Sequence, residues 1–133
     1  MAKKAIHAKK AIKGLKPCLR EKKRYLVFEV LSEKPVKDRK AINKAILSSF
    51  MSLYGELAFA KAGLLTLPDF EEEQQGGLIS QKGIIRTSTK SVDDLRTAIM
   101  MVKSVSNETV AVRTAGVSGI LKKARLYMQN VAA

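Results

Sequence analysis

The sequence predicts an α+β sandwich: an antiparallel four-stranded sheet with two helices on one face and an extra C-terminal helix. Three observations lead to this fold. The chain has 133 residues, about the size of one domain. Segments rich in β-branched and aromatic residues alternate with segments whose apolar residues recur at helical spacing. The order strand, helix, strand, strand, helix, strand, helix matches the split βαβ arrangement through its sixth element.

The first strand is predicted over Arg24–Leu31, which reads RYLVFEVL. Alternation along a strand gives it one apolar face and one mixed face. The apolar face holds Leu26, Phe28 and Val30, and the mixed face holds Tyr25, Val27 and Glu29.

The first helix is predicted from Asp38 to about Tyr54, after the Lys34-Pro35 break and before a stop at Gly55. Apolar residues recur along it at helical spacing and form one face. That face consists of Ile42, Ala45, Ile46, Ser49, Phe50 and Leu53.

A second strand is predicted over Leu57–Leu67, bulged at Gly63. Residues 68–81 combine a proline, a Gly-Gly pair and three glutamates, which is typical of a loop. This is the only acidic patch of the sequence, and the role of residues 69–75 is left unassigned. A third strand is predicted over Lys82–Thr89.

Ser91 and Asp94 have the spacing of a capping box before the second helix. The apolar stripe of that helix includes Val92, Leu95, Ile99 and Val102. A fourth strand is predicted over Thr109–Thr114, and a last helix from about Ile120 to Asn130. Right-handed crossovers would place the first and third strands side by side at the centre of the sheet.

The formal net charge is +13, from 25 basic and 12 acidic residues. Such a charge attracts polyanions, with nucleic acid the first expectation and an anionic membrane surface the second. The lysine-rich residues 1–18 are expected to form a flexible basic arm ahead of a single domain at 19–133. Because no apolar run suits a membrane helix or a signal peptide, we expect a cytoplasmic protein.

Residue types suited to catalysis are scarce. His7 is the only histidine and Cys18 the only cysteine. A zinc site of ordinary ligand type, an internal disulfide and a Ser/His/Asp triad are therefore all disfavoured. Glu71, Glu72 and Glu73 lack the Asp/Asn/Gly framework of a dedicated magnesium site. We expect no catalytic residue, no metal site and no cofactor bound by the protein itself.

Basic residues on the predicted sheet and last helix are candidates for phosphate contacts. Arg86 and Arg113 fall on strands that flank the first strand, with Glu29 expected between them. A cross-strand salt bridge and a phosphate contact are equally open interpretations. Gly116–Gly119 opens the last helix beside two lysines, where free N–H groups suit phosphate. A Gly-rich turn that lets the helix pack closely is the favoured interpretation of that segment.

RNA-recognition domains share the predicted topology and stack bases on aromatic rings of their first and third strands. Here only Tyr25 could stand on the uncovered face of the two central strands. Stacking of single-stranded bases is therefore poorly supported. The aliphatic and charged residues of that face are expected to meet a protein or the final helix.

Three segments in order carry a resemblance to a known family: KKRY at Lys22–Tyr25, KGIIR at Lys82–Arg86 and RTAGVSG at Arg113–Gly119. The strongest local matches are KKRYLVFEV, GIIRTS and VRTAGVSGILKKAR. From about residue 19 to 128 the chain resembles the archaeal ribonuclease P protein component 2 family, related to the small RNA-recognition-like subunit of eukaryotic ribonuclease P/MRP. The basic arm and residues 69–75 are less typical of the family in length or composition.

The resemblance implies a ferredoxin-like, RNA-recognition-like fold and a subunit of ribonuclease P, the RNA-based endoribonuclease that removes the 5′ leader of precursor tRNA. It implies assembly with ribonuclease P RNA and a TIM-barrel protein subunit, two copies of each protein forming a heterotetramer. Magnesium would be used by the partner RNA, and the chain itself would not be catalytic. The expected RNA contacts are Lys22, Lys23, Arg24, Arg86, Arg113, Lys122, Lys123 and Arg125.

Two other functions stay open on the residues alone. A ribosomal or other structural RNA-binding protein would bind its RNA without any role in tRNA cleavage. An enzyme of ferredoxin-like fold would need intrinsic turnover and a pocket of convergent polar groups for a small anionic substrate. The sequence offers no placement of histidine or carboxylates that indicates such a pocket.

Overall fold

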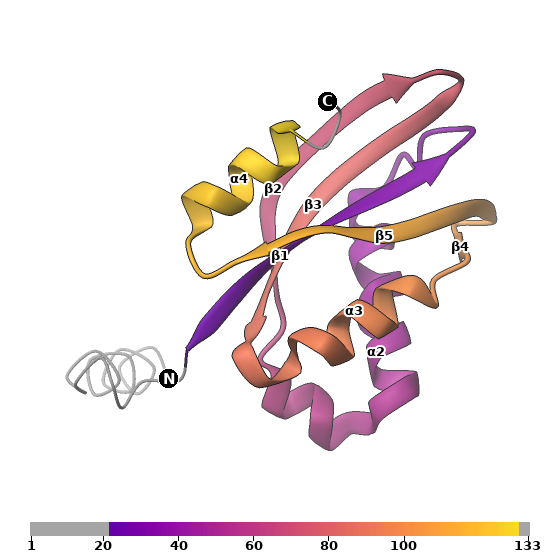
Figure 1. Ribbon diagram of the computed structural model, residues 1–133. Coiled ribbons are helices and arrows are strands. Elements are labelled where there is room, and N and C mark those ends of the chain that lie inside the picture. The colour runs from indigo at the N-terminus through magenta and orange to yellow at the C-terminus, as the bar shows by residue number, and fades with distance from the viewer. Residues whose placement is uncertain (1–21, 131–133) are drawn as a thin grey trace, which may run out of the picture.

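The computed structural model describes residues 22–130, which form a curled antiparallel sheet with helices on both faces (Figure 1). The predicted arm at 1–18 lies outside the described residues. Across the sheet the strands follow the order β2-β3-β1-β5-β4. Their bounds are β1 (Lys23–Ser32), β2 (Leu65–Gln75), β3 (Leu78–Ser88), β4 (Ser104–Val105) and β5 (Glu108–Ser118). The predicted α+β fold class is confirmed.

The strand β1 runs through the centre of the sheet and pairs antiparallel with β3 on one side and β5 on the other. The predicted pairing of the first and third strands is therefore confirmed. The side chains alternate as predicted, because Leu26 and Phe28 enter the main core whereas Val27 faces the opposite side.

The helix α2 (Arg39–Ala62) is longer than predicted and bent. A stop at Gly55 and a strand over Leu57–Leu67 were expected, and both predictions were wrong. The chain passes Gly55 at φ 86° and ψ 174° and then resumes the helix. Glycine adopts this conformation without a side-chain clash, so here it marks a kink. The helix ends instead at Gly63, whose φ of 58° is left-handed.

A long β2–β3 hairpin replaces the loop predicted over residues 68–81, so that prediction was wrong. The turn is confined to Gly76 and Gly77, both with positive φ. The glutamates of this segment lie in β2, and the side chains of Glu72 and Glu73 interact with residues of β3. For example, Glu72 accepts a hydrogen bond from Gln81 Nε2 at 3.1 Å. Cross-strand contacts of this kind offset the low strand propensity of a glutamate run.

The helix α3 (Val92–Met100) follows a short 3-10 turn, η2 (Thr89–Ser91). The predicted capping box does not form within the described chain, because the Ser91 side chain makes no capping hydrogen bond. Instead Ser88 Oγ donates to Ser91 Oγ at 3.2 Å. A tight turn at Ser106 and Asn107, both with positive φ, then joins β4 to β5.

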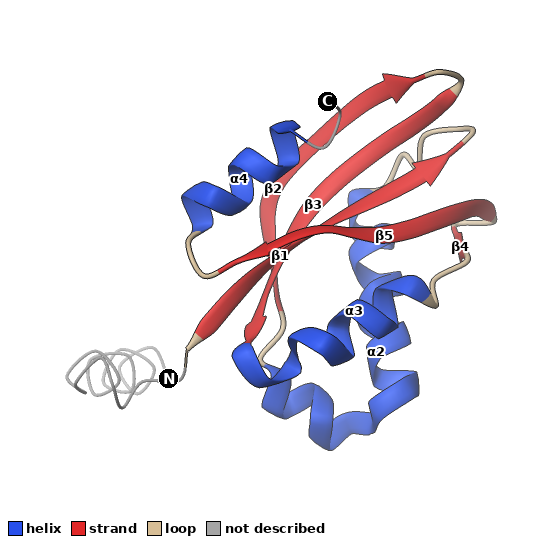
Figure 2. Ribbon diagram, in the orientation of Figure 1, coloured by secondary structure: helices blue, strands red, loops and turns tan. Residues whose placement is uncertain are grey.

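The two faces of the sheet are covered by different helices (Figure 2). α2 and α3 enclose the main hydrophobic core on one face. The last helix, α4 (Leu121–Asn130), lies on the other face, over a second cluster whose buried members are Val27, Ile84, Ala124 and Met128. Within residues 22–130, no helix is both long and apolar enough to cross a membrane.

Candidate nucleic-acid interface

The helix α4 covers the sheet face that RNA-recognition domains leave open for bases. Its apolar positions Leu121, Ala124 and Met128 recur at helical spacing and meet Val27 and Ile84 of the central strands. The expectation that this face meets the final helix is confirmed. Tyr25 is half-buried in the same packing, so the one candidate stacking ring lies beside α4.

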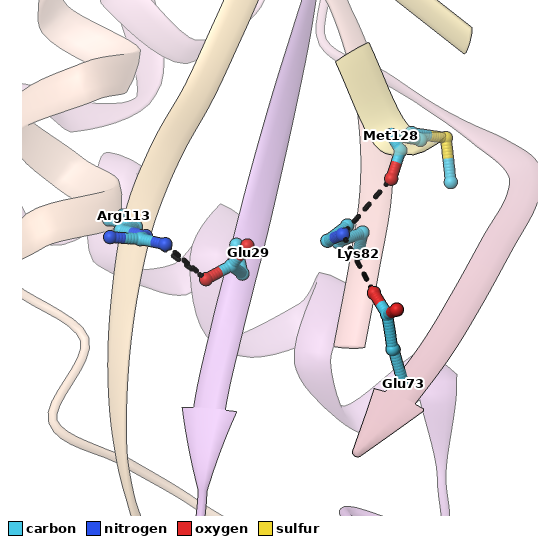
Figure 3. Close-up of polar contacts among 5 residues, drawn as sticks. All are labelled: Glu29, Glu73, Lys82, Arg113 and Met128. Atoms are coloured by element: carbon cyan, nitrogen blue, oxygen red, sulfur yellow. Dashed lines mark hydrogen bonds and ion pairs between the residues drawn. The ribbon is translucent and has the colours of Figure 1, made fainter. Parts of the chain in front are cut away.

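A buried lysine holds the C-terminal end of α4 against the sheet (Figure 3). Lys82 is only 1% exposed, and its Nζ donates to the Met128 carbonyl oxygen at 3.0 Å. The same nitrogen lies 3.6 Å from Glu73 Oε2 on β2. A lysine that loses its hydration needs such partners, and the last carbonyls of a helix carry partial negative charge. Lys82 thus fixes where α4 ends on the sheet.

Glu29 and Arg113 form a cross-strand ion pair next to this lysine. Glu29 is fully buried, and its Oε1 accepts from Arg113 Nε at 3.0 Å and Nη2 at 2.7 Å. The salt-bridge interpretation of Arg113 is therefore confirmed. The expected placement of Glu29 between two arginines was wrong. Lys82 stands opposite Glu29 on β3, whereas Arg86 stands opposite Tyr25, four residues away along β1.

Basic side chains gather where α4 begins. Arg24 packs its guanidinium against Gly119, just before the helix. Arg86 is the cross-strand neighbour of Tyr25, whose partner on the other side is Ser118, at the end of β5. The exposed Lys122 and Lys123 lie in the first turn of α4. We call Arg24, Arg86, Lys122 and Lys123 the α4-start cluster; they are four of the eight predicted contacts.

Two further predicted contacts continue this region toward the N-terminus. Lys22 is exposed, and its carbonyl oxygen accepts hydrogen bonds from the Thr89 amide and Oγ1, both at 3.1 Å. That anchoring fixes the start of β1 against η2. Lys23 is half-buried, with its Nζ near Gly63. The start of β1 and the residue before it therefore bring three successive basic residues to one end of the sheet.

The two remaining predicted contacts are already paired with carboxylates. Arg113 binds the buried Glu29, as described, and is 58% exposed. Arg125 is 55% exposed, and its Nε lies 3.0 Å from Asp69 Oδ1 on β2. An ion pair this exposed contributes at most about 1 kcal/mol, so Arg125 could exchange its partner at little cost. Arg113 differs, because breaking its ion pair would leave the buried Glu29 carboxylate without this partner.

Arg86 has an unusual polar environment for a strand residue. Its side chain is half-buried, and its Nε is buried without a hydrogen-bond partner in the described residues. A buried donor without a partner costs free energy unless water or a ligand satisfies it. The remaining guanidinium nitrogens can donate to one phosphate in a bidentate manner.

The segment Gly116–Gly119 does not open the last helix as predicted. Gly116 and Ser118 belong to β5, and the Ile120 amide donates to Ser118 Oγ at 3.1 Å. The favoured interpretation, close packing of the last helix, holds at one position. A Cβ at Gly116 would lie 2.7 Å from Cδ2 of Tyr127, so only glycine lets this ring of α4 approach the strand.

Sequence reasoning missed Lys82 and Asp69 as residues that position α4. The signal for Lys82 was a charged residue on the same face of the central sheet as Glu29. Asp69 was hidden because its segment was predicted to be a loop. Among residues 22–130, no three His, Cys, Asp or Glu side chains come close enough together to hold a metal ion.

The fold and the charge distribution define a small, basic α+β protein whose RNA-recognition-like sheet is closed by a helix. A family model, the Rpp14/Pop5 family, matches residues 24–129. The chain is 38% identical over 111 residues to ribonuclease P protein component 2 of Thermococcus kodakarensis, covering 84% of this chain and 86% of that protein. It is 34% identical over 119 residues to the protein of that name from Archaeoglobus fulgidus, covering 89% and 99%.

A more distant relative gives the same result. Ribonuclease P protein component 2 of Methanocaldococcus jannaschii is 29% identical over 121 residues, which are 90% of this chain and 82% of that protein. The chain belongs to the Rpp14/Pop5 family.

Proposed function

We propose that this chain acts in tRNA processing as a protein subunit of ribonuclease P. The observation that carries the proposal is the family match over residues 24–129, nearly the whole described domain. The chain acts as a component of the complex and not as a stand-alone enzyme. The α4 face fits this role, because its charged residues are arranged as ion pairs and exposed cations rather than as a catalytic set.

In the proposed mechanism, the partner RNA and its magnesium ions perform the hydrolysis of the phosphodiester bond. The contribution of the protein is electrostatic. Folding the catalytic RNA brings phosphates close together, and cations placed between them reduce their repulsion. The α4-start cluster supplies such cations from three different elements, β1, β3 and α4.

We assign the RNA contact to the α4-start cluster together with Lys22 and Lys23. Lys122 and Lys123 are exposed on a helix whose position is fixed from below, so they present charge without large loss of backbone freedom on binding. Arg125 would join them by releasing Asp69. Arg113 is assigned instead to the ion pair with Glu29, and its role toward RNA stays a prediction.

The finer partners belong to the same proposal. They are precursor tRNA held in the complex and a TIM-barrel protein subunit, with two copies of each protein forming a heterotetramer. A cytoplasmic location also stays a prediction. The net charge of +13 supports an RNA partner, because a protein surface of that charge gains affinity for phosphates through counterion release.

The test is precursor tRNA cleavage by archaeal ribonuclease P RNA at moderate magnesium, with the TIM-barrel subunit present and with or without this chain. Strong stimulation that requires both proteins is expected. No stimulation, with both proteins folded and the RNA active by itself at high magnesium, would refute the proposal. The alternative of a ribosomal or other structural RNA-binding protein would then take its place.

A further inference from the structure

The sheet face opposite α4 carries a groove between the first half of α2 and the edge strand β2. One hollow of about 360 Å³ lies against Leu47, Met51 and Phe59. A second hollow of about 270 Å³ lies against Leu67, Pro68 and Phe70. Both hollows are also lined by Lys40 and Asn43, so they adjoin along the helix. We call the two hollows together the α2 groove.

Three features of α2 and β2 create the α2 groove: the orientation of the helix, an irregular edge strand and a kink. The buried residues Ile42, Ile46 and Phe50 point α2 toward the core and leave a parallel stripe of the helix facing β2. The edge strand loses its regular register with β3 between Thr66 and Phe70. The kink of α2 at Gly55 brings Phe59 back to line the groove, where its ring meets Phe50 at a centroid distance of 6.3 Å.

The rim of the α2 groove is cationic, and its cations have no ion-pair partner in the part of the chain that the structure describes. Among residues 22–130, Arg39, Lys40 and Lys44 form no salt bridge, whereas the cations of the α4 face, Lys82, Arg113 and Arg125, each have one. Arg39 lies 4.1 Å from the ring centre of Phe70. Asp69, the one carboxylate in the described lining, is taken by Arg125.

We propose that the α2 groove docks an acidic, amphipathic segment of a protein partner, with aliphatic side chains on the groove floor and carboxylates on Arg39, Lys40 and Lys44. This inference rests on the proposed function, because it supposes a multi-subunit complex. The charge of the rim selects an acidic occupant. The stripe of floor residues, at helical spacing along α2, suits the aliphatic anchors of a docked segment.

The lining favours a protein over RNA as the occupant. RNA bases bind through a free aromatic face and through donors and acceptors directed at their edges. The Phe70 ring is already in contact with Arg39, and the half-buried Phe59 ring packs against Phe50. The rest of the floor near Phe59 includes the aliphatic side chains of Leu47 and Met51. The α2 groove also lies on the other side of the sheet from the α4-start cluster, so a protein and RNA can bind at once.

The experiment compares two charge reversals of equal size. Lys40→Glu/Lys44→Glu alters the α2 groove, and Lys122→Glu/Lys123→Glu alters the α4-start cluster. Each full-length variant is titrated calorimetrically with the TIM-barrel subunit at several salt concentrations, and separately with ribonuclease P RNA. The groove variant is expected to bind the protein subunit at least about tenfold more weakly and with less salt dependence. The control variant should retain protein binding and lose RNA affinity.

A second variant guards against a folding defect. Met51 is 38% exposed on the groove wall, so Met51→Glu should fold normally, as checked by thermal melting, and still weaken protein binding. Binding of both groove variants with wild-type affinity would overturn the inference, as would a loss of RNA affinity in them as large as in the control variant. Neither of these outcomes changes whether the wild-type chain stimulates precursor tRNA cleavage. Failure of this inference is therefore distinguishable from failure of the proposed function.

Discussion

Within residues 22–130, the core between the sheet and the helices α2 and α3 contains sixteen buried hydrophobic residues, whereas the cluster between the sheet and α4 contains four. The first face is held by apolar burial, which has no fixed direction and mainly provides stability. The second face adds directional contacts, the Lys82 bond to the end of α4 and the Arg125 pair with Asp69. One face therefore stabilises the fold, and the other fixes the position of a charged helix.

The largest expected effect is on the stabilising face. Phe50 is 1% exposed and packs against Tyr54 and Phe59, so Phe50→Ala should lower the free energy of unfolding by about 3–5 kcal/mol. Urea denaturation measures the change. Leu57→Ala on the same helix, at a site 70% exposed, should change it by less than about 0.5 kcal/mol. Equal losses in the two variants would contradict the description of this core.

Lys82→Met tests the anchoring of α4. The Met128 carbonyl would lose its donor and Glu73 its ion-pair partner, so the free energy of unfolding should fall by about 1–3 kcal/mol. Amide hydrogen exchange should rise in α4 and stay slow in α2. The exposed Lys103→Met is the control. Unchanged exchange in α4 would show that apolar packing alone holds the helix.

Gly116→Ala probes the close approach of α4 to β5. The new methyl group would meet the Tyr127 ring at 2.7 Å, so the free energy of unfolding should fall by about 1–3 kcal/mol. Adding Tyr127→Ala should restore part of the loss, which thermal or urea melts of the single and double variants can measure. If the loss of unfolding free energy in the double variant equals the sum of the losses in the two single variants, the two sites do not interact.

The smallest effects on stability, but clear effects on binding, are expected in the exposed cations of α4. Lys122→Ala/Lys123→Ala should lower the salt slope of RNA binding by about 1–2, because fewer counterions are released. Arg125→Ala should change it less, since Arg125 already has Asp69 as partner. A salt slope that does not change in the lysine variant would remove these lysines from the interface. A change as large in Arg125→Ala would contradict the smaller role given to Arg125.

Much of the fold follows from local pattern. The alternation in β1 and the helical stripe of α2 were predictable because buried apolar positions repeat with the period of the element. The largest errors in the bounds of helices and strands fall between Gly55 and Gln81. A glycine at positive φ can kink a helix as well as end it, and glutamates in β2 are compatible with a strand once Gln81 and Lys82 lie opposite. Both outcomes depend on tertiary contacts, which the local sequence does not contain.

The predicted site was partly separable by sequence alone. Lys122 and Lys123 could be assigned to the protein surface, because their charge and their position in the predicted last helix both indicate that they are exposed. The pairing of Arg113 with Glu29 and of Arg125 with Asp69 could not be decided, since it depends on register and on where α4 docks. The α2 groove was equally hidden, because it arises from a kink and an irregular edge strand.

The most direct test of the central claim is precursor tRNA cleavage measured across magnesium concentrations, with wild-type chain and with Arg24→Ala/Lys122→Ala/Lys123→Ala, in the presence of the TIM-barrel subunit. If the α4-start cluster screens RNA phosphates, the variant should need more magnesium to reach the same rate and should equal the wild type at saturating magnesium. Superimposable curves for the two proteins would contradict the account.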